Sequence, residues 1–375
     1  MGLKYNLEII QTKAKERTVK TQSIEYDLET LVKKIKKNTI KLDPDYQRRH
    51  RWDNVMSSKL IESLILNIPI PTIYLSYDID VDVEAEDGGA RYSVIDGQQR
   101  LTAILNFFEN KYALEGLDIL NDLDACFYRD LPPFLLRRLE ERTIKCLRID
   151  STVDPQVKYD IFERLNSGSV KLESHELRNA ILRGPFNNRC KELARFLPFR
   201  KLLQISIDNP DDNSKVKKME DVELVLRFFA LIDDNYKNYK KTANTQFKDF
   251  LSATLEKMNA LSIDDINKEA SRFEKTMTVI YDNFGELAFA KYKETDSGLE
   301  KQSNFNAAVY DALTVSVESF LKKKNYSKDI NISKDKIDAF SQLFKNKEFH
   351  ESVSGSILDN SKITYRIELA KNIFK

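Results

Sequence analysis

The sequence has few cysteines, and their spacing excludes two kinds of site. Cys126, Cys146 and Cys190 are odd in number, lie far apart and include no CxxC pair. Neither a disulfide framework nor a zinc knuckle is therefore indicated. We expect these residues to be buried free thiols in a reducing cytosol.

An excess of charge of either sign is also lacking. The 60 Lys and Arg residues balance 59 Asp and Glu residues, which leaves a formal net charge of +1. The chain as a whole is therefore not a polycation that coats nucleic acid, and any such contact must come from a local patch. A hydrophobic content of 41% is enough to build a full core.

Long apolar runs are absent as well. No run approaches the roughly 20 residues of a membrane-spanning helix. The first twenty residues, MGLKYNLEIIQTKAKERTVK, lack the apolar segment and small-residue cleavage site of a signal peptide. We expect a soluble cytoplasmic protein.

The chain changes character along its length. Strand-like and helix-like segments alternate up to about residue 185, and the remainder has almost entirely helical periodicity. This pattern predicts an α+β fold, a small mixed sheet followed by a helical domain. The polar segment 207–218, IDNPDDNSKVKK, is the best candidate linker, so we predict domains at 1–206 and 207–375.

Local signals predict individual elements. Asp53 is a plausible N-cap for a helix over 53–66, and strands are expected on either side of an acidic hairpin loop. The predicted helices are 27–40, 53–66, 98–112, 154–168, 173–182 and a long helix near 263–284. The predicted strands are 72–77, 91–95 and 143–150.

The segment VIDGQQRLTAI, residues 94–104, joins a strand to a helix through a glycine. Such a junction gathers backbone N–H groups and the positive end of the helix dipole at one point, which favours an anion. Gly97 permits the bend, Arg100 offers a fork of donors suited to phosphate, and Gln98 and Gln99 add neutral polar groups. Asp96 would hold Mg²⁺, orient Arg100 or position a water molecule.

A simpler interpretation of the same segment remains open. Asp96 would cap the helix, Gly97 would make the turn, and the Gln-Gln-Arg side chains would be solvated. We expect Arg100 to lie in an exposed first turn, so that its replacement leaves the fold intact. No GxxxxGK[ST] segment and no GxGxxG after a strand occur, so neither a P-loop nor a Rossmann dinucleotide site is indicated.

A second cluster combines arginines with rings over residues 46–52, YQRRHRW. Arginines position phosphates and rings stack on bases, so Arg48, Arg49 and Arg51 are candidate DNA contacts. The alternative is that Tyr46 and Trp52 are core anchors beside a basic turn, and for Trp52 we favour this alternative.

A third cluster is FERLNSGSVKLESHELRNAILRG, residues 162–184. A helix ending at Asn166 would face a second helix that carries Glu176 and Asn179, and together they could wall a pocket. A capped helix–loop–helix explains most of the pattern. Capping and solvation leave only Glu176 and Asn179 without an explanation.

Four segments in this order, PDYQR, LIESLILNIPIPTIYL, VIDGQQRLTAILNFF and FERLNSG…KLESHELRNAILRG, resemble the N-terminal family of GmrSD-type modification-dependent restriction systems. The resemblance is close over roughly residues 20–190, and the helical remainder is similar in pattern only. It implies a ParB/sulfiredoxin-like α+β core in which the strand–glycine–helix turn holds nucleotide phosphates. It also implies nucleotide hydrolysis coupled to anti-phage defence.

By this resemblance, Asp96, Gln98, Gln99 and Arg100 carry over as the catalytic nucleotide site, with Asp96 as the Mg²⁺ ligand. Tyr46, Gln47 and Arg48 would form a nearby wall or a DNA contact. The full set of nucleotide-binding candidates is Gly97, Gln98, Arg100, Thr102, Tyr46, Gln47, Arg48, Asn166, Glu176 and Asn179.

One departure from the family concerns its C-terminal HNH-type nuclease. This chain has only His50, His175 and His350, and none lies in the required pattern. We therefore expect the chain to lack that nuclease. If DNA is cut, a partner nuclease or modification-system subunit, or the N-terminal domain itself, would cut it.

Three functions follow as hypotheses. The first is a Mg²⁺-dependent nucleoside triphosphatase that acts on or senses DNA, with a homo-oligomer as one state of assembly. The second is a non-catalytic DNA-binding sensor that uses Arg48, Arg49, Arg51 and the basic segment 33–37. The third is a metal-dependent DNase in the ParB-like domain, with Asp43, Asp45, Asp53 and Asp96 as candidate ligands.

Overall fold

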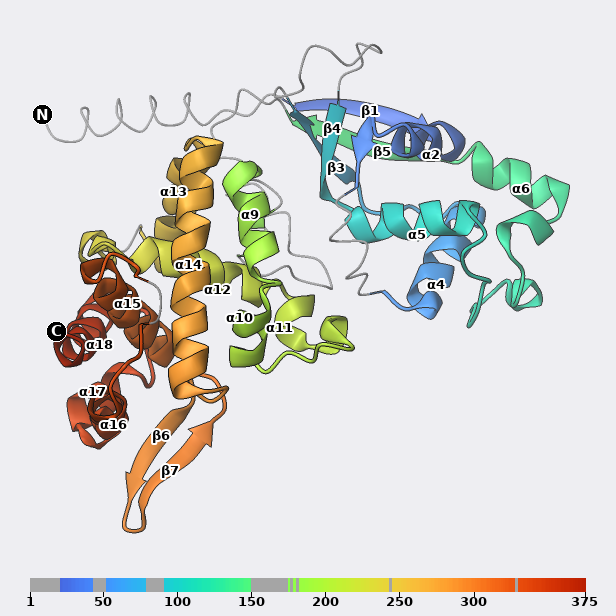
Figure 1. Cartoon of the computed structure of the whole chain (residues 1–375). Helices are drawn as coiled ribbons and strands as arrows, with labels where there is room; N and C mark the ends of the chain where they lie inside the picture. Colours follow the sequence, from blue (N-terminus) through green and yellow to red (C-terminus); the bar gives the residue numbers. More distant parts are fainter. Residues whose placement is uncertain are drawn as a thin grey trace, which may run out of the picture. The chain divides into compact units, whose positions relative to one another are not determined.

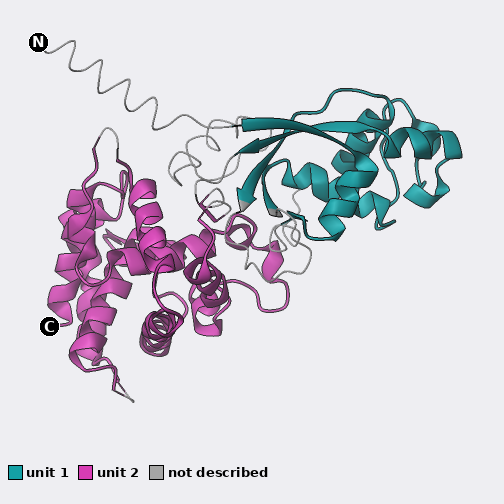
Figure 2. Cartoon of the chain, turned by 90° about the horizontal axis from the view of Figure 1, so that it is seen from above, with its two compact units in different colours: residues 1–172 teal, residues 173–375 magenta. Residues whose placement is uncertain are grey.

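The computed structural model describes residues 21–42, 52–78, 91–149, 175, 178–179, 182–242, 245–327 and 330–375. The chain forms two compact units, Met1–Leu172 and Glu173–Lys375 (Figure 2). Each unit has its own cluster of buried apolar side chains.

The first unit contains a five-stranded mixed sheet in the order β1-β5-β3-β4-β2. β1 pairs with β5 and β3 pairs with β4 in antiparallel fashion, whereas β3–β5 and β2–β4 are parallel. The strands are β1 (Thr21–Asp27), β2 (Ile40–Lys41), β3 (Ile73–Asp78), β4 (Arg91–Asp96) and β5 (Thr143–Ile149). The helices are α2 (Leu28–Lys36), α4 (Asn54–Ile65), α5 (Gln98–Phe108) and α6 (Pro133–Glu140) (Figure 1).

One face of this sheet carries the core of the first unit. Strand register places Leu75 opposite Val94 and Ile73 opposite Cys146, and all four side chains are buried. Because side chains alternate along a strand, this face is apolar across three neighbouring strands. Helices α2, α4 and α5 contribute their buried leucine and isoleucine side chains to the same cluster.

Short-range signals determine where the helices of this unit begin. Asp27 Oδ1 accepts a hydrogen bond from the Thr30 N–H at 2.7 Å, and Asp53 Oδ1 accepts one from the Met56 N–H at 2.7 Å. The predicted Asp53 N-cap is therefore confirmed. The antiparallel pairing of β3 with β4 also confirms the predicted hairpin, whose acidic loop lies outside the described residues.

The second unit is mainly helical, as the periodicity predicts. Its longest helix buries a stripe formed by Ile266, Ala270, Phe273, Met277 and Ile280. The helices are α9 (Pro185–Leu193), α10 (Leu197–Leu202), α11 (Ser214–Lys217), α12 (Glu220–Leu231), α13 (Phe247–Asn259), α14 (Ile263–Phe284), α15 (Ala307–Lys323), α16 (Lys334–Gln342), α17 (Lys347–Ser352) and α18 (Asn360–Ile373). Figure 1 shows α14 running through the helical part of this unit.

A hairpin of β6 (Lys291–Thr295) and β7 (Gly298–Ser303) interrupts the helices and was not expected. Its sequence, KYKETDSGLEKQS, places charged side chains on both faces, so it lacks the apolar alternation that identifies a half-buried strand. The turn is made by Asp296 and Ser297, and Gly298 begins β7 with a φ of +115°.

The two compact units divide the chain after residue 172 rather than after residue 206. Phe186, Cys190, Leu193 and Phe199 are buried in the core of the second unit. The polar segment 207–218 forms surface turns and α11 within that unit. Its composition thus indicates exposure and does not mark a division between the compact units.

Candidate functional site

The DGQQR segment forms the strand–glycine–helix junction that the sequence predicts. β4 ends at Asp96, α5 begins at Gln98, and Gly97 lies between them with φ +99° and ψ 9°. This left-handed conformation is costly for any residue with a Cβ atom. The backbone geometry therefore requires glycine at this position.

Packing requires glycine at position 97 as well. A Cβ atom on Gly97 would lie 2.3 Å from Cδ1 of Ile73, which is fully buried at the start of β3. The junction thus lies directly against the central strand of the sheet. The first turn of α5 is held at a fixed position relative to β3 for this reason.

Arg100 is buried, so the expectation of an exposed first turn is wrong. Its Nη1 donates to the carbonyl oxygen of Pro71 and to that of Thr72 at 3.4 Å, and its Nη2 donates to Asp96 Oδ2 at 2.6 Å. The side chain of Arg100 is 11% exposed. It packs inward because the turn of α5 that carries it lies against the residues that precede β3.

Asp96 is paired with Arg100 at this junction. Its Oδ2 pairs with Arg100, and its side chain is 37% exposed. Helix α5 has no side-chain hydrogen bond at its N-cap. The N-cap is Gly97, which has no side chain, so of the roles considered for Asp96 the contact that orients Arg100 is the one observed.

The remaining side chains of the turn are less exposed than the solvated interpretation requires. Gln98 and Thr102 are buried, and Gln99 is half-buried. The partly exposed side chains at the junction are thus those of Gln99 and Asp96. Backbone N–H groups at a helix N-terminus can bind an anion without any basic side chain.

Several predicted site residues lie outside the described residues: Tyr46, Gln47, Arg48, Arg49, Arg51, Asn166 and Glu176, together with the candidate metal ligands Asp43 and Asp45. Trp52 is partly buried against the first core, as the core-anchor interpretation predicts. The carboxylate of Asp53 caps α4 by accepting the hydrogen bond from the Met56 N–H.

Asn179 has a structural role within the second unit. It is buried, and its Nδ2 donates to the carbonyl oxygen of His175 at 3.0 Å, while Asn187 Nδ2 donates to the Asn179 carbonyl at 3.3 Å. These contacts tie consecutive segments of this unit together. They explain Asn179 without a ligand.

An arginine–tyrosine cluster on the sheet was missed. Arg148 of β5 donates through Nη1 to the Tyr92 hydroxyl at 2.9 Å, and its guanidinium lies 5.8 Å from the Tyr92 ring and 5.9 Å from the Tyr77 ring. The alternation of Ile144, Cys146 and Arg148 along the strand is the signal that could have placed this arginine on the covered face.

The cysteines, clusters of metal-binding side chains and membrane-spanning helices were also considered in the sequence and can be compared with the structure. Cys146 and Cys190 are buried and Cys126 is partly exposed, all as free thiols, and burial raises the pKa of Cys146 to about 12. Over the described ranges, no three His, Cys, Asp or Glu side chains are arranged to share a metal ion. In the same ranges no helix combines the length and apolar character needed to cross a bilayer.

The order of these elements, from the first residue of α2 through the DGQQR junction to the segment before α9, can be compared with known families. Residues 28–183 match the model of the GmrSD restriction endonuclease N-terminal domain. The resemblance to GmrSD-type systems is therefore confirmed for this segment, and residues 184–375 lie beyond the match. Neither the curated proteins nor the solved structures gave a match.

Proposed function

We propose that this protein is a restriction-type defence component that binds and hydrolyses nucleoside triphosphates and acts on or senses DNA. Its GmrSD-like segment would be a ParB/sulfiredoxin-like nucleotide-binding domain. The observation that carries the proposal is that the DGQQR sequence in this segment forms a glycine turn with Arg100 and Asp96 paired behind it. The description of the matched domain, part of a restriction endonuclease, supports DNA as the target.

The phosphates would contact the backbone at the start of α5. This helix has 11 residues, long enough for a full dipole at its N-terminus. Both terminal nitrogens of Arg100 donate to protein oxygens, so we propose that Arg100 positions the turn rather than the phosphates. Gln99, which is half-buried, is the side chain best placed to orient a phosphate or an attacking water molecule.

Mg²⁺ would be bound by the nucleotide together with Asp96. In triphosphate sites this ion commonly takes one or two carboxylates, and the phosphates and water supply its other ligands. A single partly exposed carboxylate beside the turn fits that requirement. The ion would neutralise charge on the phosphates during hydrolysis.

The experiment is phosphate release from ATP, GTP, CTP and UTP with Mg²⁺, in the presence and absence of DNA. Asp96→Asn keeps the shape of the side chain and removes its charge, and we expect turnover to fall about a hundredfold. Asp118→Asn is the matched control, because Asp118 is an exposed carboxylate of the same unit, paired with Lys59. Equal turnover in both variants would refute the proposed site.

Arg100→Ala separates positioning from binding. Because Arg100 is buried and bonded to two carbonyl groups and a carboxylate, its loss should lower both nucleotide affinity and the unfolding midpoint of the first unit. Lost affinity with an unchanged midpoint would instead make Arg100 a direct phosphate ligand.

The second candidate, a non-catalytic DNA-binding sensor, is favoured by the outer face of α2 and its C-terminal end. Lys33, Lys36 and Lys37 are exposed there, while Leu31 and Ile35 face the core. Its signature would be DNA affinity that falls steeply with salt and does not respond to nucleotides. Cleavage of supercoiled plasmid with Mg²⁺ or Mn²⁺ would instead support the third candidate, a DNase.

A further inference from the structure

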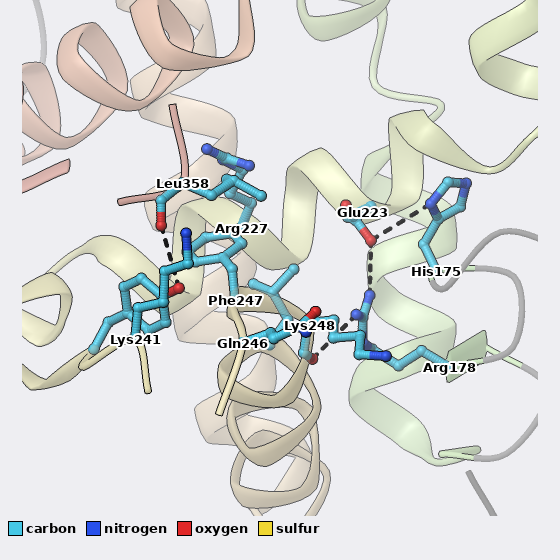
Figure 3. A pocket seen from close by; sticks show the side chains of 11 residues that line it. His175, Arg178, Glu223, Arg227, Lys241, Gln246, Phe247, Lys248 and Leu358 are labelled. Atoms are coloured by element: carbon cyan, nitrogen blue, oxygen red, sulfur yellow. Dashed lines mark hydrogen bonds and ion pairs between the residues drawn. The ribbon is translucent and has the colours of Figure 1, made fainter. Parts of the chain in front are cut away.

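The helical unit contains a cavity of about 500 Å³ that shares no residue with the DGQQR junction. Its lining comes from the segment that carries His175 and Arg178, from α12, from Tyr239 and Lys241, from the start of α13 with the residue before it, and from Leu358 (Figure 3). A volume of this size is typical of sites for small ligands.

The lining is rich in cations. Arg178, Arg227, Lys241 and Lys248 all border the cavity, and among the described lining residues Glu223 is the single carboxylate. Lys241 is paired with Asp359 at 2.6 Å at the exposed rim. The interior of the cavity therefore has an excess of positive charge.

The two arginines are held in fixed positions. Arg178 Nη1 donates to Glu223 Oε2 at 2.8 Å, its Nε donates to Ser252 Oγ at 3.2 Å, and its Nη2 donates to the Lys248 carbonyl at 3.2 Å. Figure 3 shows Glu223 between Arg178 and His175. The guanidinium of Arg227 lies 4.6 Å from the centre of the Phe247 ring. A cationic surface arranged in advance loses little entropy when an anion binds.

Charges behind the cavity do not cancel this excess. Arg227 Nη2 donates to Asp311 Oδ2 at 2.6 Å, and the fully buried Arg366 donates to the same oxygen. One buried carboxylate thus serves two buried guanidinium groups. Nε of Arg366 has no hydrogen-bond partner among the described residues. Because an uncompensated buried charge is costly, an anion in the adjacent cavity would be stabilised.

The cavity also has an apolar wall and a helix end. Phe247, Leu251 and Tyr239 border it, and the Phe247 and Tyr239 rings meet edge to face at 5.2 Å. Gln246 is the N-cap of α13, so the positive end of that helix faces the same region. The carboxylate of Asp249, in the first turn of α13, accepts a hydrogen bond from the Gln246 N–H.

From these observations we propose that the cavity binds a small phosphorylated molecule of mononucleotide size. The phosphate would lie against Lys248, and the planar or apolar part against Phe247. Arg178, whose nitrogens donate to protein oxygens, would contribute its charge from the wall of the cavity. A phosphate ester matches the excess of cations better than a monocarboxylate does, because it carries close to two negative charges. This site is additional to the nucleotide site proposed at Gly97, and it does not depend on that proposal.

The test is titration calorimetry of the full chain with AMP and with inorganic phosphate. Lys248→Gln removes a half-buried cation from the cavity and should weaken AMP binding about tenfold. Lys257→Gln is the matched control, since Lys257 is an exposed lysine of the same helix and does not line the cavity. Lys241→Gln, at the rim, should have a smaller effect than Lys248→Gln.

Four results would overturn the proposal. The first is no binding of AMP or phosphate at millimolar concentration, and the second is an equal loss of affinity in Lys248→Gln and Lys257→Gln. The third is loss of AMP binding in Asp96→Asn with full binding in Lys248→Gln, which would place the nucleotide at the Gly97 turn. The fourth is tighter binding of citrate or of a 5′-phosphorylated DNA oligonucleotide than of AMP, which would change the class of ligand.

Discussion

At the scale of single residues, the protein uses a few positions where only one residue type satisfies the local geometry. Gly97 is required both by its backbone conformation and by its contact with Ile73. Asp311 is required because two buried guanidinium groups share its carboxylate. No neighbouring residue can replace Gly97 or Asp311 in these roles. Substitution at either position should therefore lower the free energy of unfolding by a large amount.

Gly97→Ala should destabilise the first unit by about 2 to 4 kcal/mol, because strain at positive φ adds to the clash with Ile73. Gly298→Ala is the control: its φ is +115°, but no atom lies within 4 Å of the added Cβ. Its cost should be about 1 kcal/mol. Chemical denaturation measures both, and equal costs would show that packing against Ile73 is unimportant.

Asp311→Asn should lower the free energy of unfolding of the helical unit by about 3 to 5 kcal/mol, because it leaves two buried arginines without a counter-charge. Asp212→Asn is the comparison, since its ion pair with Lys217 at 4.0 Å is on the surface of the same unit. We expect no measurable change in the denaturation midpoint for that variant. A small effect of Asp311→Asn would mean that water reaches the two guanidinium groups.

At the scale of elements, Glu62 connects α4 to the segment that follows α5. Its Oε1 accepts hydrogen bonds from the N–H groups of Ile119 and Leu120, both at 2.7 Å, and Oε2 accepts one from Asp118 at 3.3 Å. Burial alone would raise the pKa of Glu62, but the three N–H donors outweigh burial and lower it. The carboxylate thus acts as an anchor for an irregular segment.

The pH dependence of stability follows from this direction. The pKa of Glu62 is lower in the folded than in the unfolded chain. Its contribution to the free energy of unfolding is therefore complete at pH values above its pKa in the unfolded chain. This stabilisation is lost as the pH falls through the pKa of Glu62 in the folded chain. We expect Glu62→Gln to cost about 1 to 2 kcal/mol near pH 7 and to remove part of the acid destabilisation of the first unit. An unchanged acid profile in Glu62→Gln would contradict this role.

At the scale of the whole molecule, the two buried clusters predict two unfolding transitions. The chain has a single tryptophan, Trp52, which packs against the core of the first unit. Tryptophan fluorescence should therefore report unfolding of the first unit. The far-ultraviolet circular dichroism should be dominated by the helices of the second.

Two variants test this assignment together. Gly97→Ala should shift the fluorescence transition and leave most of the dichroism change in place, whereas Asp311→Asn should do the reverse. Urea titrations followed by both signals measure the two transitions in one sample. Coincident transitions that move together in both variants would show that the chain unfolds as one cooperative unit.

Much of the fold could be predicted because its signals act over a few residues. Asp53 caps α4 as expected, and the predicted helix at 263–284 is observed over Ile263–Phe284. The β6–β7 hairpin was missed because its charged residues give no alternating pattern. β1 was also missed, and its pairing with β5 joins segments far apart in the sequence.

The candidate site was predicted only in part. The glycine turn was expected because a strand, a glycine and a helix are adjacent along the chain. The burial of Arg100 was not, because its partners Pro71 and Thr72 approach it through the pairing of β3 with β4. The contact of Asn179 with the His175 carbonyl, four residues earlier on the predicted helix, could have been expected, whereas its contact with Asn187 depends on how the chain folds back.

The sequence by itself determined the helix caps, the amphipathic stripe of α14, the DGQQR turn and the resemblance to the GmrSD N-terminal domain. These depend on residues within a few positions of each other or on the order of motifs. Only the tertiary structure decided that Arg100 braces the turn and that Arg178, Glu223 and Arg227 border one cavity. The physical reason is that burial and charge pairing depend on which distant segments pack together, and no local pattern specifies that.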